Sequence, residues 1–82
     1  MTRTEMEARV RELLVDLAPE FEADAIDPDE DLRQQLDIDS MDLHQLATSL
    51  FEVYGVDIPE SERADLVTLR AIVDWLDAHV SR

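Results

Sequence analysis

The stretch LDIDSMDLHQLATSLFEVYG, residues 36–55, decides the fold of this 82-residue chain. Its second part repeats apolar residues at the spacing of one helical face, which predicts an amphipathic helix that ends at Tyr54. Asp39 is suited to cap the start of that helix, and Gly55, the only glycine in the chain, is suited to end it. Ser40 is therefore expected to be exposed at the head of the helix. The predicted apolar face consists of Leu43, Leu46, Ala47, Leu50, Phe51 and Tyr54.

A first helix is predicted upstream of this stretch. Thr4 followed by Glu7 has the pattern of a capping box, and Pro19 favours a stop soon after Leu17. The helical face would be formed by Val10, Leu13, Leu14 and Leu17. From Asp16 to Asp42 the chain shows little helical period. We therefore expect a long connecting loop, anchored to the core by Ile26, Leu32, Leu36 and Ile38.

A last helix is predicted downstream, capped by Thr68, and one short helical turn is expected between Ser61 and Asp65. The last helix would present Leu69, Ile72, Val73, Leu76 and Val80 on one face. The predicted fold class is thus all-α: a small four-helix bundle in one domain spanning residues 1–82, with three main helices, one short helix and a long loop after the first. We expect its core to include Leu14, Leu17, Leu46, Leu50, Ile58, Leu69, Ile72 and Leu76.

The chain is strongly acidic. Its 21 acids and seven bases, all of them arginine, give a net charge of −14. Such a surface repels nucleic acid and anionic membranes, and it attracts basic patches on other proteins. The apolar runs are too short for a membrane span, the N-terminal residues do not resemble a signal peptide, and the absence of cysteine excludes disulfides and thiolate metal sites. We expect a cytoplasmic monomer.

No catalytic or metal-binding constellation accompanies Ser40. His44 lies one helical turn away, but a hydrolytic serine also needs an oriented base and an oxyanion hole, and neither is indicated. The acidic loop matches the first three ligand positions of a calcium loop. The matching residues are Asp27, Asp29 and Asp31. The loop has Leu32 where the glycine is required and Ile38 where the bidentate glutamate is required. We therefore expect no catalytic residue and no metal site.

With these motifs in place, the chain resembles the acyl carrier protein family. The resemblance rests on Leu-x-x-Asp-Ser-Met-Asp at residues 36–42, on Val-Asp-Ile-Pro at 56–59, on Thr68-Leu69 and on the helical residues 71–76. The first helix and the acidic loop also fit, so the similarity covers nearly all of the chain. One departure is Asp37, because family members usually have glycine two residues before the Asp-Ser pair.

The resemblance implies a non-catalytic carrier with a 4′-phosphopantetheine arm on Ser40, attached from coenzyme A by a phosphopantetheinyl transferase. The thiol of the arm would carry an acyl or aminoacyl group between loading and transferring enzymes. Carriers of fatty acid synthesis usually have an acidic second helix, whereas this chain has Gln45, Phe51 and Val53 where acids are common. A specialised pathway, such as polyketide, peptide or modified-lipid assembly, is therefore favoured. The alternative is an acidic helical adaptor without a prosthetic group.

Partner enzymes are expected to contact the helix around Ser40, because an enzyme that acts on the arm must approach that serine. Met41 would be the apolar anchor of this surface, and Phe51 or Glu52 would extend it. The acids beside the serine would help a basic transferase to find the site. The full set of expected contact residues is Asp39, Met41, Asp42, His44, Gln45 and Thr48.

Overall fold

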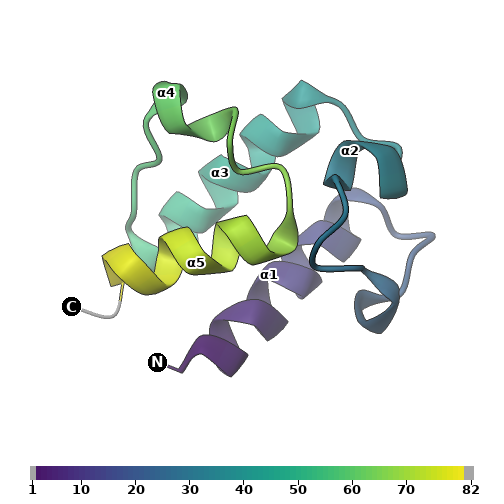
Figure 1. Ribbon diagram of the computed structural model, residues 1–82, viewed down its shortest axis with the longest axis horizontal. Coiled ribbons are helices and arrows are strands. Elements are labelled where there is room, and N and C mark those ends of the chain that lie inside the picture. Colours follow the sequence, from purple (N-terminus) through teal and green to yellow (C-terminus); the bar gives the residue numbers. More distant parts are fainter. Residues whose placement is uncertain (1, 81–82) are drawn as a thin grey trace.

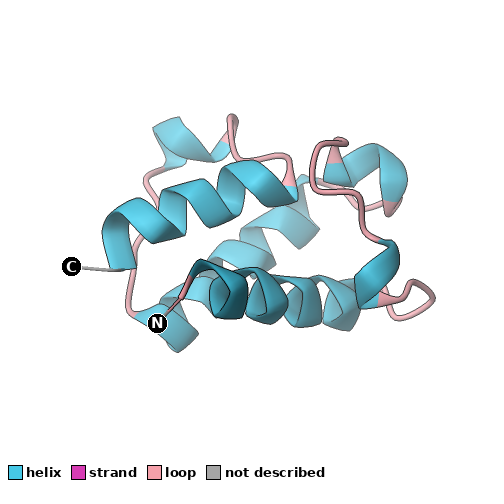
Figure 2. Cartoon of the chain, turned by 60° about the horizontal axis from the view of Figure 1, so that its bottom comes forward, coloured by secondary structure: helices cyan, strands magenta, loops and turns pink. Residues whose placement is uncertain are grey.

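The computed structural model describes residues 2–80 as an all-α fold of 34 × 26 × 21 Å (Figure 1). Its elements, in chain order, are α1 (Arg3–Leu17), a 3-10 turn η1 (Ala23–Ala25), α2 (Leu32–Gln35), α3 (Ser40–Tyr54), α4 (Glu60–Arg63) and α5 (Leu69–Val80). The long helices α1, α3 and α5 form the bundle, and α1 packs against both of the others. No strand forms among residues 2–80 (Figure 2), so the predicted fold class is confirmed.

Helix α3 begins and ends where its sequence predicts. The Asp39 carboxylate accepts a hydrogen bond from the N–H of Asp42 at 3.0 Å, and the Asp42 carboxylate accepts one from the N–H of Asp39 at 3.2 Å. This reciprocal capping box satisfies two backbone donors at the start of the helix. At the other end Gly55 adopts a left-handed φ of 71° and donates its N–H to the carbonyl of Phe51 at 2.8 Å.

Helix α1 begins earlier than expected. Its N-cap is Thr2, whose hydroxyl oxygen accepts a hydrogen bond from the N–H of Glu5 at 3.1 Å. The predicted capping box of Thr4 and Glu7 is therefore wrong. The same Thr-x-x-Glu spacing occurs two residues upstream, and the earlier start adds a turn that buries Met6 completely.

The core is one cluster of apolar side chains from α1, α3, α5 and the segments between them. Every predicted core residue is buried except Leu17, which is half-buried because α1 ends there and Ala18 takes the inner position. Phe51, predicted on the apolar face of α3, is instead 55 % exposed at the edge of that face. None of the described helices is both long and apolar enough to cross a membrane.

The connecting segment, residues 18–39, is more ordered than the predicted loop. It contains η1 and α2, so the expectation of a single short helix in the chain is wrong. The Asp31 carboxylate caps α2 by accepting a hydrogen bond from the N–H of Arg33 at 2.8 Å. Leu32 is fully buried and donates its N–H to the carbonyl of Val67 at 2.7 Å. A helix of four residues is too short to show a period in the sequence. The four residues predicted to anchor the connecting segment to the core are all buried: Ile26, Leu32, Leu36 and Ile38.

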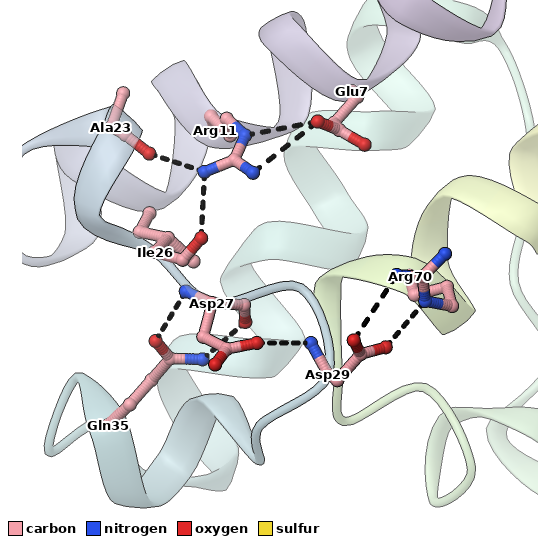
Figure 3. A network of polar contacts seen from close by, with 8 residues as sticks. All are labelled: Glu7, Arg11, Ala23, Ile26, Asp27, Asp29, Gln35 and Arg70. Atoms are coloured by element: carbon pink, nitrogen blue, oxygen red, sulfur yellow. Dashed lines mark hydrogen bonds and ion pairs between the residues drawn. The ribbon is translucent and has the colours of Figure 1, made fainter.

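Arg11 on α1 holds the first half of the connecting segment (Figure 3). Its Nη1 donates hydrogen bonds to the carbonyls of Ala23 at 2.6 Å and Ile26 at 2.8 Å. The same guanidinium forms an ion pair with Glu7 at 3.4 Å. These contacts fasten η1 to α1 through backbone acceptors, which the sequence of the segment itself does not reveal.

A second set of contacts folds the rest of the segment (Figure 3). The side-chain amide of Gln35 accepts a hydrogen bond from the N–H of Asp27 at 2.9 Å and donates one to the carbonyl of the same residue at 2.8 Å. Asp29 pairs with Arg70 at the start of α5, and the N–H of Arg70 donates to the carbonyl of Pro28 at 3.0 Å. The segment is thus tied to both α1 and α5, and it leads directly into α3.

Candidate functional site

Ser40 is the first residue of α3, and its side chain is exposed. In Figure 1 this end of α3 lies beside α2. The first turn of a helix has N–H groups without intrahelical acceptors, and its dipole favours negative charge nearby. The hydroxyl is therefore accessible to another protein, at a position suited to an anionic substituent.

The chain reaches Ser40 through a tight bend at Asp37. This residue follows the last turn of α2 and has a φ of 54°, in the left-handed region that glycine adopts without strain. This departure from the family resemblance therefore lies where the backbone adopts a conformation for which glycine is well suited. Aspartate enters this region more readily than most residues. Buried Leu36 and Ile38 flank the bend and fix the direction in which the chain enters α3.

A pocket of about 520 Å³ lies beside Ser40, between α3, α4 and the start of α5. This volume is in the range of small-molecule sites, which commonly combine apolar walls with a few polar groups. The polar lining residues are Arg33, Ser40, His44, Glu60 and Arg63. The apolar lining residues are Leu43, Leu46, Ala47, Leu50, Ile58, Ala64, Leu66, Val67 and Ile72.

His44 and Arg63 meet at this pocket. The Nη1 of Arg63 lies 2.8 Å from Nδ1 of His44. A guanidinium has only donors, so the ring nitrogen is the acceptor and the imidazole is neutral in this contact. Arg63 also donates its Nε–H to the carbonyl of Ile58 at 3.0 Å. This ring nitrogen thus binds Arg63 and is not positioned as a base for Ser40.

Arg63 is not among the residues that the sequence predicts for this site. It is 19 residues from His44 and belongs to a short helix without a strong period, so no local spacing connects the two side chains. The feature of the sequence that could have drawn attention to it is the small number of basic residues. The chain has seven bases against 21 acids, so each arginine is a candidate for a specific contact.

The predicted partner-contact residues all lie at the start of α3 and in its first turns. Met41 is 78 % exposed, and Gln45 and Thr48 are exposed further along the helix. Asp39 and Asp42 cap α3, whereas His44 lines the pocket. The six residues therefore divide between the cap, the pocket and an outer stripe that we define as Met41, Gln45 and Thr48.

Comparison with known proteins gives a family. A protein-family model described as "Phosphopantetheine attachment site" matches residues 8–76, a range that contains Ser40 and the residues that line the pocket. An acyl carrier protein from Rubrobacter xylanophilus is 30% identical over 79 residues, 96% of either chain. The chain belongs to the acyl carrier protein family. A Campylobacter hominis acyl carrier protein is 32% identical over 54 residues, covering 66% of this chain and 68% of that protein. The solved structure of the Enterococcus faecalis acyl carrier protein shares the fold, with a TM-score of 0.81 at 23% identity over 95% of this chain and 98% of that one.

Acyl carrier proteins hold acyl groups as thioesters on phosphopantetheine, are modified by phosphopantetheinyl transferases and work with biosynthetic enzymes; they are carriers and not catalysts. The family prediction is confirmed. The described residues fit the prosthetic group in two respects. An exposed hydroxyl stands at a helix N-terminus, where a phosphodiester is favoured, and an apolar pocket of about 520 Å³ begins beside it.

Proposed function

We propose that Ser40 carries the 4′-phosphopantetheine arm and that this carrier shuttles acyl or aminoacyl thioesters between enzymes of a specialised pathway. The main support for this proposal is that Ser40 is an exposed serine at the start of α3 and also lines the pocket. The other serines of the matched range fit less well. Ser49 is half-buried within α3, and Ser61 lies on α4 outside the pocket lining.

The modification uses the accessibility of Ser40 and the polarity of the helix start. Within the transferase, the Ser40 oxygen forms a bond to the phosphorus next to the pantetheine of coenzyme A. The pyrophosphate bond breaks, adenosine 3′,5′-bisphosphate leaves, and the hydroxyl proton passes to a base of the transferase. The α3 dipole favours the resulting phosphodiester. Asp39 and Asp42 repel that phosphate, but they attract a basic transferase surface and so speed encounter.

The pocket supports the role of a carrier that shelters its cargo. When bound, the arm supplies a terminal thiol for the thioester, which this cysteine-free chain lacks. The pocket wall includes the core side chains of Leu46, Ile58 and Ile72, each at most 4 % exposed. An acyl chain that enters would therefore be removed from water by side chains that the fold already holds in place.

The outer stripe and its surroundings support a specialised pathway. Met41, Phe51 and Val53 are the exposed large apolar side chains among the described residues, and all three lie on α3. Partner affinity would thus rest on apolar contact along the helix, with Met41 as the anchor nearest to Ser40. An unbranched thioether adapts to irregular partner pockets. The acids of the connecting segment would mainly raise the rate of encounter.

The test is modification of the purified chain with coenzyme A and a broad-specificity phosphopantetheinyl transferase, followed by intact-protein mass spectrometry. The wild type and Ser61→Ala should each gain one phosphopantetheine, whereas Ser40→Ala should gain none. Met41→Ala should slow the modification relative to Val53→Ala, which alters an apolar side chain at the far end of the same helix. A wild type that stays unmodified by several transferases would contradict the proposal and favour the adaptor.

A further inference from the structure

Arg63 differs from the other arginines of residues 2–80. Five of them form ion pairs with carboxylates: Arg3, Arg9, Arg11, Arg33 and Arg70. Arg63 forms none with a described residue, although the chain contains 21 acids. Its two hydrogen-bond partners are neutral, namely the Ile58 carbonyl at 3.0 Å and Nδ1 of His44 at 2.8 Å. Arg63 thus lacks a counter-charge among the described residues, although two hydrogen bonds hold its guanidinium in place.

These two contacts leave most of the guanidinium available for a ligand. A guanidinium has five N–H donors, and the contacts with described residues use two of them. The donors that remain are on Nη1 and Nη2, and charge-assisted hydrogen bonds from them suit a carboxylate. Arg63 is half-buried, so a bound anion would meet it in a partly water-excluded place, where charge-assisted hydrogen bonds are stronger than in open solvent.

The other charged groups of the pocket rim do not serve as the counter-charge. Arg33 is already neutralised, because its Nε and Nη2 bind the Asp31 carboxylate at 3.1 and 2.7 Å. Glu60 lines the same pocket, and the ion pairs among the described residues do not include one between it and Arg63. Asp57 shares a smaller hollow with Arg63 and likewise forms no ion pair with it. The unneutralised positive charge of this pocket is therefore that of Arg63.

We propose that Arg63, positioned by His44 and the Ile58 carbonyl, binds a carboxylate borne by the thioester-linked acyl group. The inference rests on the proposed function, because the arm on Ser40 delivers the ligand to this pocket. A purely aliphatic cargo would gain nothing from a guanidinium at the pocket wall. A carboxyacyl cargo would place its alkyl part against the apolar lining and its carboxylate against Arg63.

The position of Arg63 favours a cargo carboxylate over the phosphate of the arm. Arg63 contacts His44 and shares the smaller hollow with Ala47 and Thr48. These residues lie four to eight positions beyond Ser40, which is roughly 6–12 Å along the helix axis at about 1.5 Å per residue. A phosphate bonded directly to Ser40 stays near the first turn, whereas a group at the far end of the arm reaches further.

The experiment loads the protein with two cargoes of matched length. The transferase attaches pantetheine arms that end in a stable amide of either a dicarboxylic acid or its neutral methyl ester, and mass spectrometry confirms each product. The readouts are the thermal midpoint of unfolding and the NMR signal of the Arg63 Nε–H, assigned with Arg63→Gln. In the wild type the carboxyl cargo should raise the midpoint by roughly 4 °C over the ester, the shift of a contact worth about 1 kcal/mol in a domain of this size. It should also move the Arg63 signal.

The variants separate recognition from general stability. Arg63→Gln should lose the difference between the two cargoes, and Glu62→Gln, an exposed residue of the same short helix outside the pocket lining, should keep it. Should Arg63→Gln not fold, Arg63→Lys provides a second comparison. It retains the charge without the planar fork, so the difference between the two cargoes should shrink. Equal midpoints for the two cargoes in the wild type would overturn the inference. An Arg63 signal that moves as far with the bare arm would also overturn it, by assigning the anion to the phosphate. Absence of any mass gain would overturn the proposed function, and this inference with it.

Discussion

The two regions on either side of Ser40 are held by different forces. Downstream, α3 is fastened by its apolar face, with Leu46 and Leu50 almost fully buried, and by caps within its own sequence. Upstream, the connecting segment contains only short helical turns, and side chains of other elements bind its backbone, as Arg11 does. Two kinds of contact therefore position the serine. Apolar packing sets the direction of the helix that carries it, and polar contacts set the path by which the chain arrives.

The polar contacts of the connecting segment also join it to the far side of the pocket. Leu32 donates its N–H to the carbonyl of Val67 at 2.7 Å, and the N–H of Arg70 donates to the carbonyl of Pro28 at 3.0 Å. Val67 lines the pocket. A change that loosens the connecting segment should therefore disturb the pocket as well as the approach to Ser40.

The largest effect is expected in the packed region. Leu46→Ala or Ile72→Ala removes a core side chain and leaves a cavity, at a cost of about 2–5 kcal/mol, a large fraction of the stability of a domain this small. Urea unfolding followed by circular dichroism measures the loss. Val53→Ala on the exposed side of α3 is the matched control, with a change expected within roughly 0.5 kcal/mol. Losses below about 1 kcal/mol at both core sites would show that the apolar face is not what holds α3.

A smaller but clear effect is expected where the connecting segment meets α1. Arg11→Met keeps the length and apolar contacts of the side chain but leaves the carbonyls of Ala23 and Ile26 without this donor, at a cost of about 1–3 kcal/mol. Arg9→Met is the control, because within residues 2–80 that exposed side chain forms an ion pair only with exposed Glu12, and such pairs contribute about 0–1 kcal/mol. Hydrogen exchange should speed up in residues 18–39 for the first variant alone. Equal effects would mean that the buried anchors suffice without Arg11.

The bend at Asp37 should give an effect that depends on the backbone and not on charge. Asp37→Val places a β-branched residue at a φ of 54° and should cost about 1–2 kcal/mol, whereas Asp37→Asn should be nearly neutral. Asp37→Gly should match or exceed the wild-type thermal midpoint, because glycine adopts this conformation without strain. If the asparagine variant lost as much stability as the valine variant, the carboxylate and not the backbone angle would be the important feature.

The same contrast explains which parts of the molecule could be predicted from sequence. Period, caps and motif are local, so α3, its ends at Asp39 and Gly55, and the position of Ser40 were predicted correctly. The four anchors of the connecting segment could also be predicted, because isolated apolar residues in an acidic stretch are expected to pack into the hydrophobic core. The roles of Arg11 and Arg63 could not, since their partners lie 5 to 19 residues away without a periodic spacing and are mostly backbone carbonyls, which every residue has. Helix α2 was missed because it depends on a buried leucine and a single cap instead of a period.

The smallest effect is expected at the ion pair between Asp29 and Arg70, which joins the connecting segment to α5. Hydrogen bonds from the Arg70 guanidinium hold the pKa of the Asp29 carboxyl below its usual range. A carboxyl whose pKa is lower in the folded than in the unfolded state stabilises the fold above the unfolded value of about 3.9, and this stabilisation is lost as the pH falls through the folded value. Both side chains are more than half exposed, so the contribution should be small.

Neutralising any acid in this chain also relieves self-repulsion, because the net charge is −14. Asp29→Asn must therefore be compared with Glu30→Gln, the exposed neighbour whose carboxylate has no ion pair among the described residues. At pH 7 the midpoint of Asp29→Asn should lie below that of Glu30→Gln, and the gap should close as the pH falls below about 4, where the pair is lost in the wild type as well. A gap that persists at pH 2 would show that Asp29 acts through its hydrogen bonds as a neutral group. In that case hydrogen bonds of the neutral side chain, and not charge, would hold the connecting segment against α5.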